Sequence, residues 1–311
     1  MPAPDYQSLI DAATWAFIRD SEASYPPDTA SMTIADQRRI YDSMCAKFHR
    51  SYPAGVVAED RVISGVPCRV YAGPKSSETT PKVVYLHGGG YVVGGLHSHD
   101  DVCADIRAVT DLQVVAVDYR LSPEHLHPAA FEDARAVVQA LPGPLVLVGD
   151  SAGGNLAAAV GHALRGEARI LGQVLIYPGL GGDRSKGSYL AHAFAPMLTL
   201  ADVEFYAGIR HGGVEVQDDA TVAPLQDTDF SGLPPTVAIA AECDPLADDA
   251  HEYAAAIRAA GGQAVSFTAP GMVHGYLRAR VTVPRAAASF TEICTAISAL
   301  AQGRWPYGET Q

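Results

Sequence analysis

The chain has 311 residues, of which 48% are hydrophobic and 18% charged, a composition typical of a folded globular protein rather than a disordered one. Its 35 acidic and 22 basic residues give a formal net charge of −13 at pH 7, which disfavours nucleic acid and anionic membrane surfaces as partners. No apolar run approaches the roughly 20 residues that span a bilayer, and the N-terminus lacks the features of a secretion signal, so we expect a cytoplasmic protein without stable membrane insertion.

The N-terminal part of the chain predicts helices rather than strands. Apolar residues recur at helical spacing over residues 11–19 and again over residues 34–48. Ser31 and Thr33 precede the second stretch and are candidate N-caps, because a hydroxyl there can accept a hydrogen bond from the first helical turn. We expect residues 1–55 to form cap helices that precede the main domain.

Farther along the chain, short apolar strands alternate with helices. Strands are predicted at residues 66–71, 82–86, 112–117, 144–148, 170–177, 236–241 and 264–268, with a polar turn at 73–81. Helices are predicted at residues 98–109, 129–141, 152–164, 246–260 and 285–300. This alternation predicts an α/β fold with a mostly parallel central sheet flanked by helices.

Residues 179–213 interrupt the alternation with glycine-rich sequence and one predicted helix near residues 200–209. We expect an insertion at about residues 180–215, which would join the N-terminal helices in a helical cap over the strand ends. The catalytic domain is then expected to span residues 56–311, including this insertion.

Residues 149–153 read Gly-Asp-Ser-Ala-Gly, the pattern GxSxG, between a predicted strand and a predicted helix. The chain must turn so sharply there that Ser151 takes a strained backbone, and small flanking residues avoid collisions. The turn exposes the Ser151 hydroxyl beside a helix N-terminus, whose N–H groups favour an anion. A chance match in a glycine-rich loop is the alternative, and the strand–turn–helix context disfavours it. We predict that Ser151 is a nucleophile.

Residues 87–90 read His-Gly-Gly-Gly and directly follow a predicted strand. Acyl transfer builds negative charge on a carbonyl oxygen, and glycines let backbone N–H groups approach that oxygen without obstruction. A phosphate-binding loop is the alternative, but it would need GxGxxG or GK[ST] opening a helix, and neither is present. We therefore predict an oxyanion-binding loop.

A neutral hydroxyl needs a general base, and in hydrolases of this architecture the order along the chain is serine, acid, histidine. The histidines after the predicted nucleophile are His162, His192, His211, His251 and His274. The first four fall in predicted helices or in the insertion, where a structural role explains them. His274 follows a predicted strand, in a loop that would bring it to the strand ends, and we predict that it is the base.

The acid is expected at the end of the preceding strand, where Asp244 stands. Its role would be to hold the histidine tautomer and to stabilise the imidazolium, without taking the proton itself. Asp244 could also simply cap the helix that Pro245 begins, and both roles are compatible. The alternatives are Glu242, Asp248 and Asp249, of which the last two fit a helix face better.

Other polar groups do not predict a metal site. The five cysteines are scattered without CxxC spacing, which supports neither a disulfide framework nor a zinc site. His97, His99, Asp100 and Asp101 form a cluster that could suggest a metal, but helix capping and a solvated first helical turn explain it better.

Taken together, these segments resemble the hormone-sensitive-lipase-like esterases, also called bacterial family IV, of the α/β-hydrolase superfamily. The matching segments are residues 87–91, 118–124, 149–155, 244–246 and 274–275. The resemblance implies an α/β-hydrolase core with a helical cap, no cofactor, and a preference for short to medium acyl chains. Two departures from the family pattern, at residues 247–250 and 275–276, concern specificity rather than the catalytic groups.

Carried over residue by residue, the resemblance implies three sets of site residues. The implied catalytic triad is Ser151, Asp244 and His274. The implied oxyanion donors are the N–H groups of Gly89, Gly90 and Ala152. Weaker candidates for substrate binding are Gly88, Tyr91 and Phe194.

We predict a serine carboxylesterase that hydrolyses short- to medium-chain acyl esters through an acyl-enzyme intermediate. Its partner would be a small-molecule ester, without nucleic acid, metal or cofactor, and a homodimer is left open. One alternative is an amidase or acyltransferase with the same triad. Another is a catalytically silent ligand-binding module on the same fold, which the intact His274 disfavours.

Overall fold

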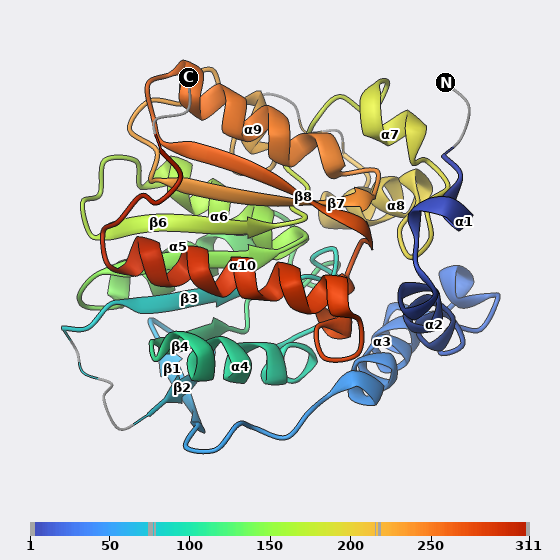
Figure 1. Cartoon of the computed structure of the whole chain (residues 1–311), viewed down its shortest axis with the longest axis horizontal. Helices are drawn as coiled ribbons and strands as arrows, with labels where there is room; N and C mark the ends of the chain where they lie inside the picture. Colours follow the sequence, from blue (N-terminus) through green and yellow to red (C-terminus); the bar gives the residue numbers. More distant parts are fainter. Residues whose placement is uncertain (1–3, 74–76, 78, 215, 217–218, 309–311) are drawn as a thin grey trace.

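The structure, a computed structural model, describes residues 4–73, 77, 79–214, 216 and 219–308. Its strands form one sheet in the order β1-β2-β4-β3-β5-β6-β7-β8 (Figure 1). Strand β2 is antiparallel to β1 and β4, and every other pairing is parallel. The predicted α/β-hydrolase fold class, with a mostly parallel sheet, is confirmed.

The strands are β1 (Val57–Ile63), β2 (Val66–Ala72), β3 (Lys82–Leu86), β4 (Gln113–Val117), β5 (Leu145–Asp150), β6 (Ile170–Ile176), β7 (Thr236–Cys243) and β8 (Ala264–Val273). The sequence did not predict β1, because this edge strand has no buried face: Val57 is 64% exposed and Val62 is 71% exposed. The predicted end of β8 was also wrong. Past an irregularity in its pairing, β8 continues to Val273, which pairs with Cys243. His274 therefore follows the strand directly.

The helices are α1 (Tyr6–Leu9), α2 (Ala12–Glu22), α3 (Ile34–Phe48), α4 (Asp100–Thr110), α5 (Ala129–Ala140), α6 (Ala152–Ala163), α7 (Gly187–Ala191), α8 (Leu200–Arg210), α9 (Ala247–Ala259) and α10 (Pro284–Ala301). Thr33 caps α3, since its hydroxyl accepts from the Asp36 N–H at 3.2 Å. Ser31 instead ends a short 3₁₀ turn. The short helices α1 and α7 were not predicted, and the turn predicted at 73–81 falls partly outside the described residues.

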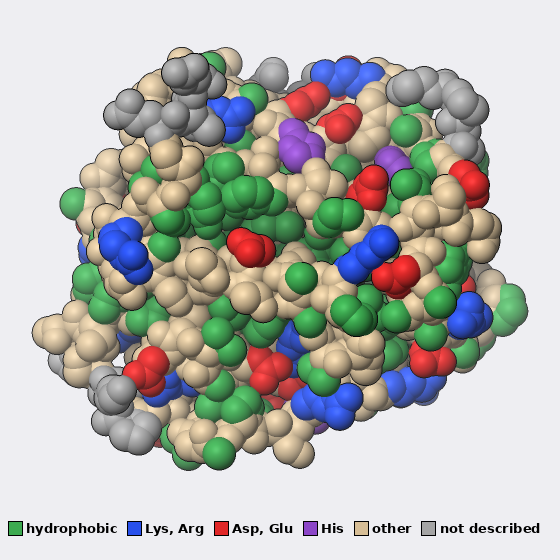
Figure 2. Space-filling view, in the orientation of Figure 1, with side chains coloured by type: hydrophobic (Ala, Val, Ile, Leu, Met, Phe, Trp, Pro, Cys, Tyr) green, Lys and Arg blue, Asp and Glu red, His purple; other side chains and the backbone are tan. Residues whose placement is uncertain are grey.

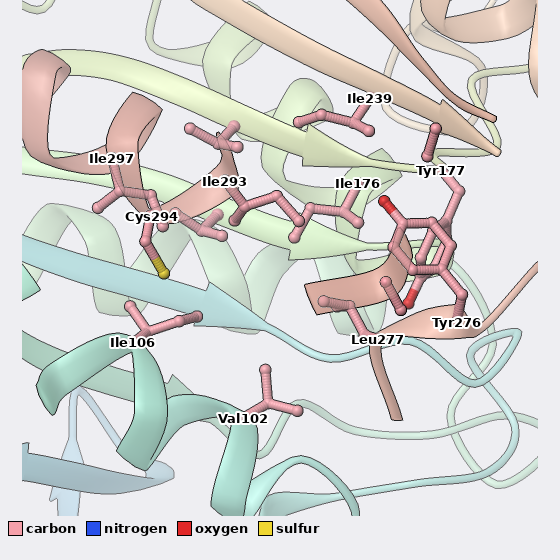
Figure 3. Close-up of a cluster of buried hydrophobic side chains, with 14 of the residues drawn as sticks. Val102, Ile106, Ile176, Tyr177, Ile239, Tyr276, Leu277, Ile293, Cys294 and Ile297 are labelled. Carbon is pink, nitrogen blue, oxygen red and sulfur yellow. The ribbon is translucent and has the colours of Figure 1, made fainter. Parts of the chain in front are cut away.

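Helices cover both faces of the sheet and bury alternate strand residues on opposite sides. On β3, Val83 and Tyr85 join the core beneath α4 and α10, whereas Val84 and Leu86 join the core beneath α5, α6 and α9. Figure 3 shows α4 and α10 directing apolar side chains toward those of the strands, among them Ile176. Because both faces are buried, the central strands are continuous apolar runs, which made them easy to predict.

The parallel strands point toward the side of the molecule where the N-terminal helices, α7 and α8 lie (Figure 1). A cavity of about 1870 Å³ opens there. Its wall includes Tyr25 and Tyr41 from the N-terminal segment, Tyr206 from α8, and residues at the strand ends. The N-terminal segment also touches the insertion at about residues 180–215, since the Tyr6 hydroxyl lies 3.1 Å from His192 Nδ1. The cap boundaries at residues 1–55 and about 180–215 stay a prediction.

The surface charges are mixed. On the face shown in Figure 2, basic side chains are interspersed with acidic and apolar ones. This face therefore offers no continuous basic surface of the kind that binds a phosphate backbone. Among the described residues, no helix combines the length and the apolar character needed to cross a bilayer.

Candidate active site

Ser151 occupies a sharp turn between β5 and α6. Its backbone has φ 56° and ψ −120°, a strained conformation for a residue with a side chain. The turn is closely packed, because a Cβ on Gly153 would lie 1.9 Å from the Leu86 carbonyl oxygen, and one on Gly149 would lie 2.2 Å from that of Gly153. The Ser151 N–H donates to the Ile176 carbonyl at 2.8 Å. The fold thus requires the glycines of the GxSxG pattern and holds the serine at the cavity.

Three side chains from separate strand ends form a hydrogen-bonded row. Ser151 Oγ lies 2.8 Å from His274 Nε2, and His274 Nδ1 lies 2.7 Å from Asp244 Oδ2. The Asp244 side chain is fully buried, and its other oxygen accepts from the Leu246 N–H at 2.9 Å. Asp244 therefore both orients the imidazole and binds the turn that precedes α9. With Nδ1 donating to the carboxylate, Nε2 is free to accept the serine proton.

The alternative acids lie elsewhere. Glu242 accepts from the Gly271 N–H at 2.6 Å and so fixes the irregular part of β8. Asp248 and Asp249 bind backbone N–H groups of Ser188 and Leu180, which tie α9 to the segment containing α7.

The alternative histidines also have other partners. His162 is buried against Asp227, with its Nδ1 2.7 Å from a carboxylate oxygen. His251 lies 2.9 Å from the Ser266 hydroxyl on β8. Of the five histidines considered, only His274 is bonded to Ser151 within the described structure.

The glycine loop after β3 presents backbone N–H groups beside Ser151. Gly89 and Gly90 have φ values of 130° and 59°, and both line the cavity together with Ala152. A Cβ on Gly89 would lie 2.1 Å from the Val93 carbonyl oxygen. Within the described chain, the N–H groups of Gly89, Gly90 and Ala152 donate to no backbone or side-chain acceptor. They are thus available to an anion at the cavity wall.

Gly88, a weak candidate for substrate binding, has its N–H engaged within the fold. Its N–H donates to Asp150 Oδ1 at 2.9 Å, and the residue does not line the cavity. Because this N–H already anchors the loop, the geometry gives no support to the predicted contact with substrate, which stays a prediction.

Asp150 is a residue whose importance the sequence did not reveal. Its buried carboxylate also accepts from the Tyr85 hydroxyl at 2.8 Å. Burial alone would raise its pKa, but the nearby His99 and Arg278 and its hydrogen bonds together lower the pKa below the ordinary value. Asp150 thus remains an anion that holds the glycine loop against the end of β5. The available signal was an acidic residue inside the GxSxG pattern, at the end of an apolar strand.

The other two weak candidates occupy different parts of the cavity. Tyr91 is nearly buried, with its ring 3.8 Å from the Arg210 guanidinium carbon. Phe194 lies on the wall of the cavity and is 88% exposed. The structure thus brings Tyr91 close to the glycine loop and leaves Phe194 at the outer part of the wall.

Arg38 on α3 connects the N-terminal segment to the glycine loop. Its Nε donates to the Val92 carbonyl at 2.7 Å and one Nη donates to the Ser122 carbonyl at 2.9 Å. The guanidinium also forms a bidentate pair with Glu124 at 2.8 and 2.7 Å. No pattern in the sequence predicts this contact, apart from the presence of Glu124 in a segment that resembles the family.

The acidic residues at the start of α4 are not solvated, contrary to the prediction. Asp100 is buried and accepts from the Tyr52 and Tyr71 hydroxyls, each at 2.7 Å. Asp101 is buried against Arg280 at 2.6 Å. Their charges are matched by internal partners, so these carboxylates bind the helix to its neighbours. Within the described residues, no cluster of three or more His, Cys, Asp or Glu is arranged to hold a metal.

His87 begins the glycine loop and is buried. Its ring stacks on Tyr119 with the centroids 4.3 Å apart, and Nδ1 lies 2.8 Å from the Gly88 carbonyl oxygen. Burial, assisted by the neighbouring His99, lowers the pKa of His87 to about 3. The ring is therefore neutral at ordinary pH and donates from Nδ1 to that carbonyl.

We expect acid to destabilise the fold through His87. The unfolded residue has a pKa of about 6.5, so its stabilisation is complete above that pH and is lost as the pH falls toward the folded pKa. In His87→Asn, the amide can replace the Nδ1 donor but does not become protonated. As the pH falls from about 6 to 4, the free energy of unfolding of this variant should decrease less steeply than that of the wild type, by about 1.4 kcal/mol per pH unit. Urea unfolding at several pH values measures both slopes, and equal slopes would contradict the assignment.

Comparison with known proteins identifies the family. A family described as the alpha/beta hydrolase fold matches residues 83–278, more than half of the chain, including the glycine loop, Ser151 and His274. The chain belongs to the α/β-hydrolase family. The match covers the segments that the sequence motifs had singled out.

Individual relatives of this α/β-hydrolase are esterases. Carboxylesterase NlhH of Mycobacterium tuberculosis is 36% identical over 72% of this chain and 75% of its own, and esterase LipI of that organism is 34% identical over 81% and 83%. A solved thermostable esterase from Pseudomonas putida superposes with a TM-score of 0.85 and 25% identity, covering 93% of this chain and 97% of that one. The resemblance to the hormone-sensitive-lipase-like esterases is confirmed, and this α/β-hydrolase is a carboxylic ester hydrolase.

Proposed function

We propose that this chain hydrolyses short- to medium-chain acyl esters of small alcohols through an acyl-enzyme formed on Ser151. The observation that carries the proposal is the row of hydrogen bonds from Ser151 through His274 to Asp244, with spacings of 2.8 and 2.7 Å. These spacings are those required for proton transfer between a nucleophile and its base.

The mechanism follows from this geometry. His274 Nε2 takes the Ser151 proton while Oγ attacks the ester carbonyl, and the negative charge develops on the carbonyl oxygen. The N–H groups of Gly89, Gly90 and Ala152 line the cavity beside Ser151 and would stabilise that oxygen. The imidazolium then protonates the leaving alcohol. Water repeats the sequence on the acyl-enzyme, and the carboxylic acid is released.

The acyl and alcohol groups of the ester would occupy the cavity. The N-terminal segment (1–55) and the insertion (about 180–215) contribute residues to the cavity wall and would form the cap that encloses the substrate. The volume of about 1870 Å³ accommodates a small ester easily. Support for short to medium chains comes from the family resemblance, because the volume alone would admit longer ones.

A series of p-nitrophenyl esters from acetate to palmitate tests the proposal. We expect kcat/KM to be highest between acetate and octanoate and to fall for palmitate. An early burst of nitrophenolate that matches the enzyme concentration would reveal the acyl-enzyme wherever deacylation is the slower step. A maximum at palmitate would contradict the chain-length proposal. Faster cleavage of p-nitroacetanilide than of the acetate ester would favour the amidase alternative.

A further inference from the structure

Arg278 is a basic side chain on the wall of the cavity that contains Ser151 and His274. It belongs to the short 3₁₀ helix η4 (Tyr276–Ala279), which directly follows the His274 loop. Its Nη1 lies 3.6 Å from the point where a Cβ on Gly275 would stand. The guanidinium is therefore next to the backbone that carries the proposed base.

The contacts of Arg278 use only part of its donors. Nε donates to the Cys45 thiol at 3.3 Å, and Nη2 donates to the Tyr41 hydroxyl. A guanidinium carries five N–H groups, and a thiol is a weak acceptor. Among the described residues, Nη1 has no hydrogen bond and the guanidinium forms no ion pair with any carboxylate. Nη1 is also not among the atoms that are fully buried without a partner, so it remains accessible to solvent.

Two other buried arginines, Arg280 and Arg210, have acceptors for their guanidinium groups. Arg280 pairs with Asp101 and Asp105 at 2.6 and 2.7 Å. Arg210 also lines the cavity without a carboxylate partner, but it donates to oxygens of Thr221, Val222 and Asn155 at 3.2 to 3.5 Å. Arg278 differs from both, because unused N–H groups of a cation remain on the cavity wall.

The acidic residues around the cavity do not supply the missing partner. Asp150 acts on Arg278 through space, but its Oδ1 accepts from Gly88 and Tyr85, and its Oδ2 accepts from the Tyr177 hydroxyl at 3.4 Å and lies 3.3 Å from His99 Nε2. The Asp202 carboxylate accepts from the N–H and the hydroxyl of Thr199, the N-cap of α8, and Glu252 pairs with Lys186 at 3.3 Å. The remaining acidic residues of the wall, none of which pairs with Arg278 in the described structure, are Glu22, Asp183 and Glu204.

We propose that Arg278 binds a carboxylate carried by the substrate, so that the preferred substrates are esters with a second, ionised carboxyl group, such as hemiesters of dicarboxylic acids. This inference rests on the proposed function and names its substrate class. A guanidinium matches a carboxylate with two parallel, charge-assisted hydrogen bonds. The bound carboxylate takes no part in bond breaking, and it orients the ester group toward Ser151.

The kinetic test uses matched ester pairs that differ by one carboxylate. On the acyl side, monoethyl glutarate carries the carboxylate and ethyl pentanoate lacks it. On the alcohol side, 4-acetoxybutyrate carries it and butyl acetate lacks it. We expect the wild type to prefer the charged member of one pair, which identifies the side that Arg278 faces. In Arg278→Gln, the ratio of kcat/KM for charged over neutral ester should fall by at least about tenfold, and Arg278→Lys should retain part of it.

Arg135→Gln is the matched control, because Arg135 is an exposed arginine on α5 that does not line the cavity. The ratio should remain at the wild-type value in this variant. A wild-type ratio near one for both pairs would overturn the inference while leaving the proposed esterase intact. An equal loss on charged and neutral esters in Arg278→Gln would also overturn it. A fall of the ratio in Arg184→Gln without a fall in Arg278→Gln would overturn it as well, because Arg184 is an exposed arginine on the same cavity wall.

A binding measurement separates the inference from the proposed chemistry. In Ser151→Ala, calorimetric titration with the charged ester should give at least about tenfold tighter binding than with the neutral one. Adding Arg278→Gln or Arg278→Lys to this background should weaken only the charged ligand. Equal binding of both ligands to Ser151→Ala would contradict the role of Arg278. The absence of all ester hydrolysis in the wild type would contradict the proposed function instead.

Discussion

Replacing Ser151 by alanine should lower kcat for p-nitrophenyl butyrate by about 10⁶-fold, because removing the nucleophile of such a triad leaves only binding and the oxyanion donors. The fold should be retained. The Ser151 N–H bond to Ile176 does not involve the side chain, and alanine has no greater bulk at this strained position. Circular dichroism and urea unfolding verify the fold, and nitrophenolate release measures activity. Wild-type activity in a folded variant would overturn the assignment of Ser151.

The same experiment extends to the base. His274→Ala should lose activity to a similar extent, and the double variant with Ser151→Ala should lose no more, because residues that act as a unit are not additive. His251→Ala is the matched control, since His251 bonds to Ser266 near the start of β8, at 2.9 Å, whereas His274 follows the end of that strand. Its kcat should stay close to that of the wild type. A large loss in His251→Ala with none in His274→Ala would show that the wrong base was chosen.

Replacing Gly89 by alanine should lower kcat by about 10²- to 10³-fold with a smaller change in KM, because an oxyanion donor acts chiefly on the transition state. The new Cβ would lie 2.1 Å from the Val93 carbonyl oxygen, and φ is 130°, so the loop must move. Since Gly90 is the next residue, its N–H would move as well. Steady-state kinetics with p-nitrophenyl butyrate measure both parameters.

Gly166→Ala provides the control for this glycine. Gly166 also has a positive φ, +78°, but a Cβ there meets no atom within 4 Å. The substitution should cost about 1–2 kcal/mol of stability from backbone strain and leave kcat unchanged. If Gly89→Ala retained wild-type kcat while remaining folded, the glycine loop would not be the oxyanion site.

The fold was largely predictable wherever burial on both faces produced a continuous apolar run. The predicted ends of β3 agree with the structure, because Lys82–Leu86 is a central strand that is entirely buried. The edge strand β1 was missed, since its exposed side chains carry no such pattern. The end of β8 was misplaced because Pro270 and Gly271 read as a loop, whereas an irregular strand can accommodate both residues.

The candidate site was predictable where a local motif or a strand end marks the residue. Ser151 has the GxSxG pattern, and Asp244 and His274 follow strands in the expected order; their catalytic roles stay predictions. Arg38 and Arg278 could not be found in this way. Their contacts join residues 54 and more than 200 positions apart, and an isolated arginine carries no signal for its distant partner. Tertiary packing alone determines those contacts.

The link that Arg38 makes between α3 and the glycine loop has a consequence for selectivity. A bulky acyl chain that displaces α3 also displaces the Val92 carbonyl, which Arg38 holds at 2.7 Å. Val92 in turn donates to the Gly89 carbonyl at 3.0 Å. We therefore expect a poor fit of the acyl chain against α3 to move the N–H groups that would face the oxyanion. Poor substrates should accordingly be turned over more slowly, and not merely bound more weakly. The same contacts, from Arg38 through Val92 to Gly89, would then affect both substrate selection and rate.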